Sequence, residues 1–184
     1  YAVDTAKACR KLGIKTVAVT AGYVCAEPRK EFYAWMDAAN VDLKGFTEDF
    51  YKKYTDSSLA PVLETLLYIK KETSVWLEIT TLLVPGLNDS DKELHALTSW
   101  IVKNLGAEVP LHFSAFHPAH KLQDVPSTPP STLFKAREIA IASGIRYCYT
   151  GNIEDPEGES TFCHACGEKL IGRNWYELSG WNLK

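Results

Sequence analysis

Short β-branched, apolar runs alternate with longer amphipathic segments along most of this sequence. The alternation predicts helices between five strands, which we place at residues 14–20, 40–44, 75–84, 111–116 and 145–149. Strands separated by helical segments of this length are typical of parallel sheets built from right-handed βαβ units. The pattern therefore predicts an α/β protein, either an open doubly wound sheet or a barrel.

The pattern changes near residue 152. Residues 153–184 are first polar, then contain the pair Cys163-x-x-Cys166, and end in short aromatic runs. We predict two domains, a parallel α/β domain over residues 1–152 and a small β-rich module over residues 153–184. Because the chain opens at Tyr1 inside a predicted helix, we also expect it to be a fragment of a longer protein.

Composition excludes several classes of partner. The 184 residues carry a net charge of -3 with a pI near 6.0, so no basic excess is available for a nucleic acid. No apolar run approaches the roughly 20 residues that a membrane span requires. Five scattered cysteines do not resemble a secreted disulfide framework, which favours a reducing cytoplasm.

The segment Val41-Asp42-Leu43-Lys44-Gly45 reads as a strand of period two. If helices cover the face of Val41 and Leu43, the charged side chains of Asp42 and Lys44 lie on the opposite face. Opposite charges on an inner face are costly unless they pair or meet a charged ligand. A structural ion pair and a ligand site both fit this spacing.

In parallel folds the carboxyl ends of the strands carry function. Strand parity predicts a polar inner face that continues over several strands, at Thr16, Thr20, Glu78, Thr80, His112 and Ser114, with His117 at the start of the next loop. Each residue alone suits a structural role, but the set favours a site for a polar, zwitterion-sized ligand. The long Pro-rich loop over residues 117–130 suits a lid or a stiff surface crossing.

Several short motifs follow one another in a fairly specific order. They are Thr20-Ala21-Gly22-Tyr23-Val24, Asn40-Val-Asp-Leu-Lys-Gly45, Val75-Trp76, Leu83-Val-Pro-Gly86, Asn88-Asp89 and His112-Phe-Ser-Ala-Phe-His-Pro118. This order resembles the radical SAM enzymes close to the pyruvate formate-lyase activating enzyme. The tail motifs Tyr149-Thr-Gly-Asn152, Thr161-Phe-Cys-His-Ala-Cys-Gly167 and Leu170-Ile-Gly-Arg173 resemble the AmmeMemoRadiSam system radical SAM enzymes in particular.

The resemblance implies a partial parallel (β/α) barrel that lacks its first strands. It also implies a 4Fe-4S cluster and S-adenosylmethionine (SAM), which is cleaved reductively to a 5′-deoxyadenosyl radical that abstracts hydrogen from a substrate. In that family the positions matching Asp42, Lys44 and His117 help to hold SAM, and the segment matching Thr20 lies near it. The methionine part of SAM carries one ammonium and one carboxylate, which complement Asp42 and Lys44. Ala21 departs from the Asn common at its position.

The family's Cys-x3-Cys-x2-Cys loop, which binds the cluster, has no match in this sequence. We therefore expect this chain alone to be unable to form the cluster or to catalyse the reaction. The substrate is unknown, and the resemblance includes enzymes whose substrate is a protein. The sheet edge left by missing strands predicts dimerisation.

Cys163 and Cys166 form half of a tetrahedral zinc site, with Gly167 allowing the sharp turn behind the second thiolate. The resemblance implies that the other two ligands come from a cysteine-rich N-terminal segment, whereas Cys148 and His164 are alternatives within the chain. A pair of free thiols is the structural alternative.

Two other functions compete with a radical SAM enzyme. A SAM-independent metal hydrolase would use His112, His117, His120 and Glu78, although His112 and His117 differ in strand parity. A non-catalytic scaffold would bind a partner and have no affinity for SAM.

Overall fold

The computed structural model describes residues 1–183. The chain forms two compact units, one of residues 1–80 and one beginning at Thr81. The larger sheet has the strand order β1-β2-β3-β4-β5, and its pairs β1–β2, β2–β3 and β4–β5 are parallel. The predicted α/β fold is thereby confirmed.

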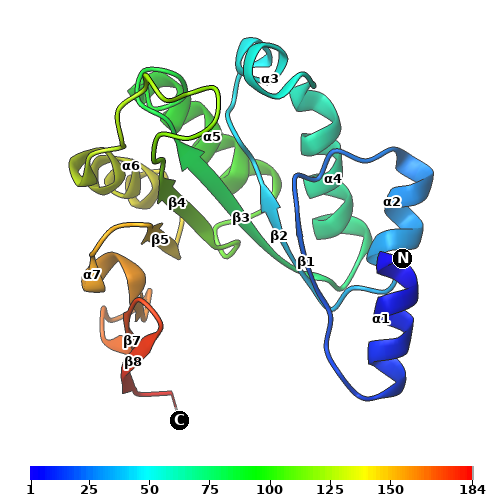
Figure 1. The fold of residues 1–184 in the computed structure, drawn as a ribbon. Coiled ribbons are helices and arrows are strands. Elements are labelled where there is room, and N and C mark those ends of the chain that lie inside the picture. The colour runs from blue at the N-terminus through cyan, green and yellow to red at the C-terminus, as the bar shows by residue number, and fades with distance from the viewer. Residues whose placement is uncertain (184) are drawn as a thin grey trace. The chain divides into compact units, whose positions relative to one another are not determined.

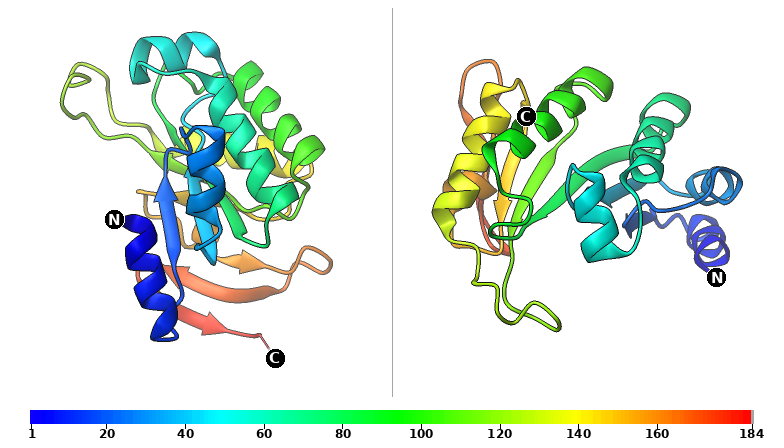
Figure 2. Two further views of the ribbon diagram at one scale, coloured as in Figure 1. Left: turned by 90° about the vertical axis from the view of Figure 1, so that its right-hand side faces the viewer. Right: turned by 90° about the horizontal axis from the view of Figure 1, so that it is seen from above.

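The first unit contains the beginning of the parallel sheet and four helices (Figure 1). Its elements are α1 (Ala2–Lys11), β1 (Val17–Thr20), α2 (Ala26–Tyr33), β2 (Ala38–Asp42), α3 (Glu48–Thr55), α4 (Leu59–Glu72) and β3 (Trp76–Leu83), which runs across the boundary between the units. Helices α1, α2 and α4 lie on the same side of β1 and β2 (Figures 1 and 2).

Alternation along β2 and β3 produces the core of this unit. Val41, Leu43 and Ile79 are fully buried, as are Leu66 and Ile69 of α4. Burying such side chains contributes about 1.5–3 kcal/mol each.

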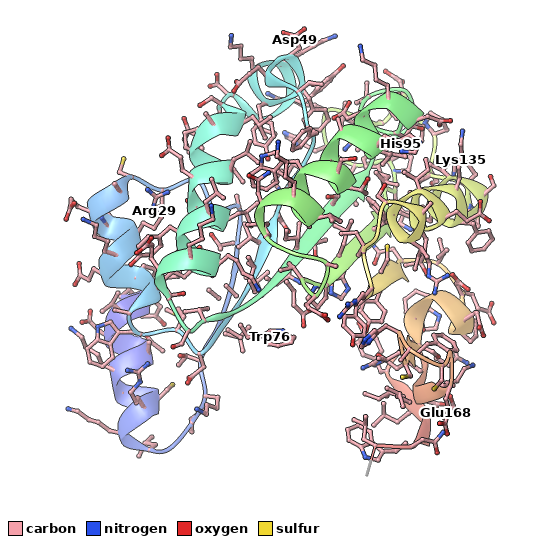
Figure 3. All side chains as sticks on the ribbon, turned by 180° about the vertical axis from the view of Figure 1, so that it is seen from behind. Arg29, Asp49, Trp76, His95, Lys135 and Glu168 are labelled. Atoms are coloured by element: carbon pink, nitrogen blue, oxygen red, sulfur yellow. The ribbon has the colours of Figure 1, made fainter. Side chains whose placement is uncertain are left out.

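Arg29 ties α2 to α4 within the first unit (Figure 3). Its side chain is 9% exposed, and its Nη1 donates to Thr65 Oγ1 at 3.3 Å. The guanidinium also lies over the Tyr68 ring, 5.5 Å from the ring centroid. A buried cation is tolerated here because both an acceptor and an aromatic face surround it.

The second unit combines two parallel strands, two long helices and a small antiparallel sheet. Its elements are α5 (Asp91–Asn104), β4 (Leu111–Ala115), α6 (Pro130–Ala142), β5 (Cys148–Gly151), α7 (Pro156–Glu159), β6 (Thr161–Phe162), β7 (Lys169–Asn174) and β8 (Glu177–Trp181). Helices α5 and α6 pack side by side (Figure 3). Thr98 and Ser143 share a hydrogen bond of 2.9 Å between them.

Strands β6, β7 and β8 form a separate antiparallel sheet in that order, which confirms the predicted β-rich tail. The predicted domain boundary between residues 152 and 153 stays a prediction.

Two strands begin later than predicted. Ile14 is not in β1, because its amide donates to Cys9 O at 3.0 Å and closes the end of α1 behind Gly13, whose φ is +72°. Ile145 is likewise not in β5, because its amide donates to Ala140 O at 3.0 Å at the end of α6. Ile14 and Ile145, which their side chains led us to place in strands, thus bond to the ends of α1 and α6 instead.

A third predicted strand is shifted as well. Strand β2 runs over Ala38–Asp42 rather than residues 40–44, although the Leu43 amide still donates to Thr80 O at 2.9 Å.

Candidate functional site

An ion pair stands at the carboxyl end of β2. Lys44 Nζ lies 2.9 Å from Asp42 Oδ2, and the two side chains are 39% and 33% exposed. The residues between and before them, Leu43 and Val41, have no exposed surface. The charges therefore lie on the face opposite the helices, as the alternation predicted, and they remain open to solvent.

The backbone that carries Lys44 is fixed from α3. Its amide donates to the hydroxyl oxygen of Tyr51 at 3.1 Å, and Tyr51 itself is buried. Burial raises the pKa of Tyr51 to about 12, so this hydroxyl is neutral at physiological pH. Gly45 follows Lys44, and Phe50 of α3 packs against it so closely that a Cβ at Gly45 would lie 2.7 Å from Phe50 Cδ1. Tyr51 was not predicted as a site residue, and its only signal in the sequence is the aromatic pair Phe50-Tyr51 a few residues after Gly45.

Strand β3 presents further polar side chains on the same face. Thr80 is the register partner of Asp42, and its Oγ1 donates to Asn40 Oδ1 at 2.8 Å. Glu78 is the partner of Asn40, and its Oε1 accepts from Trp76 Nε1 at 2.9 Å. The predicted face of Glu78 and Thr80 is therefore right. Asn40, Asp42, Glu78 and Thr80 thus form a polar row on this face. Of these, Asn40 was not singled out from the sequence.

The predicted inner position of Thr20 is wrong. Thr20 is the register partner of Val41, whose side chain lies on the helix-covered face, and adjacent partners in a parallel sheet share a face. Its Oγ1 accepts from the Gly22 amide at 3.2 Å. Thr16 has the same strand parity and donates through Oγ1 to Trp35 O at 2.7 Å.

The other face of β1 is apolar. Val17 and Val19 are 63% and 79% exposed, and Trp76 of β3 is 59% exposed. Trp76 is labelled in Figure 3. The register places Val17 beside Ala38, which is itself beside Trp76. The polar row of the first unit is thus bordered by exposed apolar side chains.

In the second unit, β4 alternates as predicted. Leu111, Phe113 and Ala115 are buried, while His112 and Ser114 between them are half-buried. The His112 ring stacks on Tyr149 of β5, with 5.1 Å between centroids. His117 follows the end of β4 and is exposed.

The cysteine pair lies between β6 and β7. The Cys163 sulfur accepts hydrogen bonds from the backbone amides of Ala165 and Cys166 and from the Cys166 thiol, and these bonds lower the pKa of Cys163. His164 is engaged by Tyr147, with 3.2 Å between Nδ1 and the hydroxyl oxygen. Cys148 is buried in β5, and burial raises the pKa of its thiol to about 12, so it does not suit a thiolate ligand.

Within residues 1–183, no three His, Cys, Asp or Glu side chains converge as a metal site. The described residues therefore do not fit a 4Fe-4S cluster, which needs several cysteine thiolates together. The same finding removes support from a hydrolase centre built from His112, His117, His120 and Glu78. No helix in the described part of the chain is long and apolar enough to cross a membrane.

No protein-family model matches the sequence. A curated relative, the uncharacterized protein MJ0808 of Methanocaldococcus jannaschii, is 45% identical over 183 residues. The match covers 100% of this chain and 54% of the relative, so the chain spans about half the length of the curated protein it matches.

Two solved structures of radical SAM type share the fold. A domain of pyruvate-formate lyase-activating enzyme from Bacteroides vulgatus superposes with a TM-score of 0.70 at 16% identity, covering 82% of this chain and 89% of that one. A radical SAM methyltransferase from Sphaerobacter thermophilus has a TM-score of 0.60 at 15% identity, covering 76% of this chain and 41% of that one. The chain therefore has the fold of a radical SAM domain, as the motif order predicted.

The fold does not define the reaction by itself. The HMG-CoA lyase of Brucella melitensis also superposes, with a TM-score of 0.51 at 12% identity over 85% of this chain and 54% of that one. One fold can carry several chemistries, so the function has to be argued from side chains.

Proposed function

We propose that this chain is the SAM-holding part of a radical SAM enzyme. The Asp42 carboxylate would receive the ammonium group of the methionine part of SAM, and the Lys44 ammonium would receive its carboxylate. The likeness to two radical SAM structures and the motif order around the pair both support the proposal.

The Asp42–Lys44 pair is the observation that carries the proposal. It combines one negative and one positive group at the carboxyl end of a parallel strand, where α/β folds place their ligands. Both side chains are partly exposed, so a zwitterion can reach them without opening the core. An ion pair with only a structural role inside the protein would instead be buried.

The neighbouring polar groups belong to the same proposal. Glu78 and Thr80 share the face of Asp42 and suit hydrogen bonds to the polar groups of SAM. For the second unit we propose ligand contacts by His112, Ser114 and His117, on the resemblance and on the alternation of β4. Thr20 is not included, because its side chain lies on the helix-covered face.

Reductive cleavage of SAM supplies radical SAM enzymes with the radical that takes hydrogen from their substrate. That chemistry needs a 4Fe-4S cluster, for which the described residues offer no ligand set. The role proposed for this chain is therefore to bind and orient SAM, and the chain alone is proposed to be inactive. We also propose that the substrate of the enzyme is a protein. A separate part of the proposal is that the chain dimerises along the edge of β1.

Equilibrium dialysis of labelled SAM against the purified chain tests the proposal. Asp42→Asn and Lys44→Met should each weaken binding about tenfold, because each removes one charge-assisted contact at a partly exposed site. The exposed pair Glu27–Lys30, at 2.8 Å, provides matched controls, and Glu27→Gln and Lys30→Met should leave binding unchanged. Absence of SAM binding by the folded chain, or equal binding by all four variants, would refute it.

A further inference from the structure

Three side chains in contact join the tail to the parallel strands of the second unit. The His112 ring of β4 stacks on the Tyr149 ring of β5, with 5.1 Å between centroids and 27° between the ring planes. The Arg173 guanidinium of β7 lies over the same Tyr149 ring, 5.9 Å from its centroid. One aromatic ring is therefore contacted from two elements, a strand of the parallel sheet and a strand of the tail.

Hydrogen bonds fix both the Tyr149 hydroxyl and the Arg173 guanidinium. The Thr161 hydroxyl oxygen accepts from Arg173 Nη1 at 2.6 Å and shares a hydrogen bond of 2.9 Å with the Tyr149 hydroxyl. Arg173 Nη1 also donates to Glu159 O at 3.2 Å, and the Arg173 amide donates to the hydroxyl oxygen of buried Ser160 at 3.1 Å. Because backbone and side chain of Arg173 are both held, the guanidinium has a defined position over the ring.

The small sheet is irregular at the two residues that bind Tyr149. The pairing of β6 with β7 shifts register between Thr161 and Phe162, and the pairing of β7 with β8 shifts register between Gly172 and Arg173. Irregularities of this kind re-aim side chains, and they are over-represented next to active sites. The backbone of the tail is thus adapted at the point where it meets Tyr149.

The Tyr149 ring lies on the face that carries the proposed ligand contacts of the second unit. His112 and Tyr149 are register partners in the parallel pairing of β4 with β5, so their side chains share a face. Ser114 lies on the same face, two residues further along β4. A side chain that contacts a ligand needs neighbours that restrict its rotation, and the stack on Tyr149 does this for the His112 imidazole.

We propose that Arg173 is a positioning residue of the ligand site, which acts through the Tyr149 ring to hold the His112 imidazole in the orientation that contacts SAM. The inference rests on the proposed function, which assigns that contact to His112. It gives the motif Leu170-Ile-Gly-Arg173 of the tail a role in binding, although Arg173 does not itself touch the ligand. Loss of the guanidinium would leave both rings less restrained, so that ordering them on binding would cost more conformational entropy.

NMR signals of the His112 ring, assigned with His112→Ala, test the positioning without ligand. The ring current of Tyr149 shifts these signals by an amount that depends on how the two rings stack. Arg173→Met and Tyr149→Leu should each move them toward the signals of an unstacked imidazole. Arg173→Lys should move them less, because an ammonium keeps a charge over the ring, and Tyr149→Phe should keep most of the stack. Arg146→Met is the matched control, because this exposed arginine is paired with Glu108 instead, and it should leave the signals unchanged.

Equilibrium dialysis of labelled SAM against the same variants tests the consequence for binding. His112→Ala should weaken binding about tenfold and Arg173→Met about fivefold, with Arg173→Lys closer to wild type and Arg146→Met unchanged. Tyr149→Leu should also weaken binding about fivefold, and it tests the same contact without depending on how Arg173→Met folds. Urea unfolding shows which variants are folded.

Two results would overturn the inference and leave the proposed function intact. One is that neither Arg173→Met nor Tyr149→Leu moves the His112 signals. The other is that His112→Ala weakens SAM binding whereas Arg173→Met and Tyr149→Leu do not. If His112→Ala binds SAM as wild type does, the ligand contact proposed for His112 is wrong and the inference fails with it.

Discussion

The hydroxyl oxygen of Tyr51 accepts a hydrogen bond from the backbone amide of Lys44, with 3.1 Å between oxygen and nitrogen. The contact joins a buried residue of α3 to the segment that carries the ion pair. It therefore couples the packing of a helix to the position of a charged side chain on the opposite face of the sheet.

Tyr51→Phe removes the acceptor and keeps the ring. We expect the free energy of unfolding to fall by about 0.5–1.5 kcal/mol, because the Lys44 amide loses a part-buried hydrogen bond. Chemical denaturation of the two proteins measures the difference. Tyr176→Phe, at a side chain that is 98% exposed, is the control and should change nothing. Equal stability of Tyr51→Phe and wild type would show that the contact does not hold this segment.

The same residue makes stability depend on alkaline pH. Burial raises the pKa of Tyr51 from 10.0 to about 12, so the unfolded chain loses this proton at lower pH than the folded one. Stability from this group is intact below pH 10 and is lost as the pH rises toward 12. Between pH 10 and 12, wild type should therefore lose stability more steeply than Tyr51→Phe. Parallel pH curves for the two proteins would contradict this.

Gly22 lies against the helix-covered face of β2. A Cβ there would stand 2.7 Å from Val41 Cγ1, and its φ is +67°. Gly22→Ala should cost about 2–4 kcal/mol of stability, from overpacking together with backbone strain. Gly13→Ala is the matched control, because φ is +72° and no atom lies within 4 Å of the added carbon. Its cost should be only the strain, about 1 kcal/mol. Equal thermal shifts for the two variants would rule out the packing argument.

Thr128 ties the end of the long Pro-rich loop to two strand ends of the second unit. It is buried, its Oγ1 donates to Leu83 O at 2.6 Å, and it accepts from the Phe116 amide at 3.0 Å. Thr128→Val should lower the free energy of unfolding by about 2–3 kcal/mol. The reason is that the Leu83 carbonyl and the Phe116 amide each lose their hydrogen bond to the Thr128 hydroxyl. The exposed neighbour Ser127→Ala should stay within about 0.5 kcal/mol of wild type. Urea unfolding distinguishes them, and a neutral Thr128→Val would mean that the loop is held elsewhere.

Local pattern was sufficient to predict which side chains of β2, β3 and β4 are buried. Large apolar residues recur on one face of these strands, among them Val41, Ile79 and Phe113, and that face is the buried one. On β1 the same reasoning failed, because its apolar residues Val17 and Val19 are the exposed ones. Only the register with β2 reveals that the small residue Ala18 and the polar Thr20 lie on the helix-covered face.

The site was predictable only where one strand supplies it. Asp42 and Lys44 are two residues apart, so period-two geometry alone places them on one face. Tyr51 and the contact between Gly22 and Val41 depend on how separate elements pack, which no local pattern encodes. The turn at Cys163 and Cys166 was predictable only in part. The spacing of the two cysteines is visible in the sequence, whereas the backbone amides that bond to Cys163 are not.

Displacement of labelled SAM by free L-methionine tests the central claim most directly. If Asp42 and Lys44 hold the ammonium and carboxylate groups, L-methionine should compete with SAM for the wild-type chain. The competition should be lost when both groups are changed, in Asp42→Asn/Lys44→Met. Decanoic acid, which has a carboxylate and no ammonium, should not compete. SAM that binds tightly, resists L-methionine and is bound equally by the double variant would contradict the account.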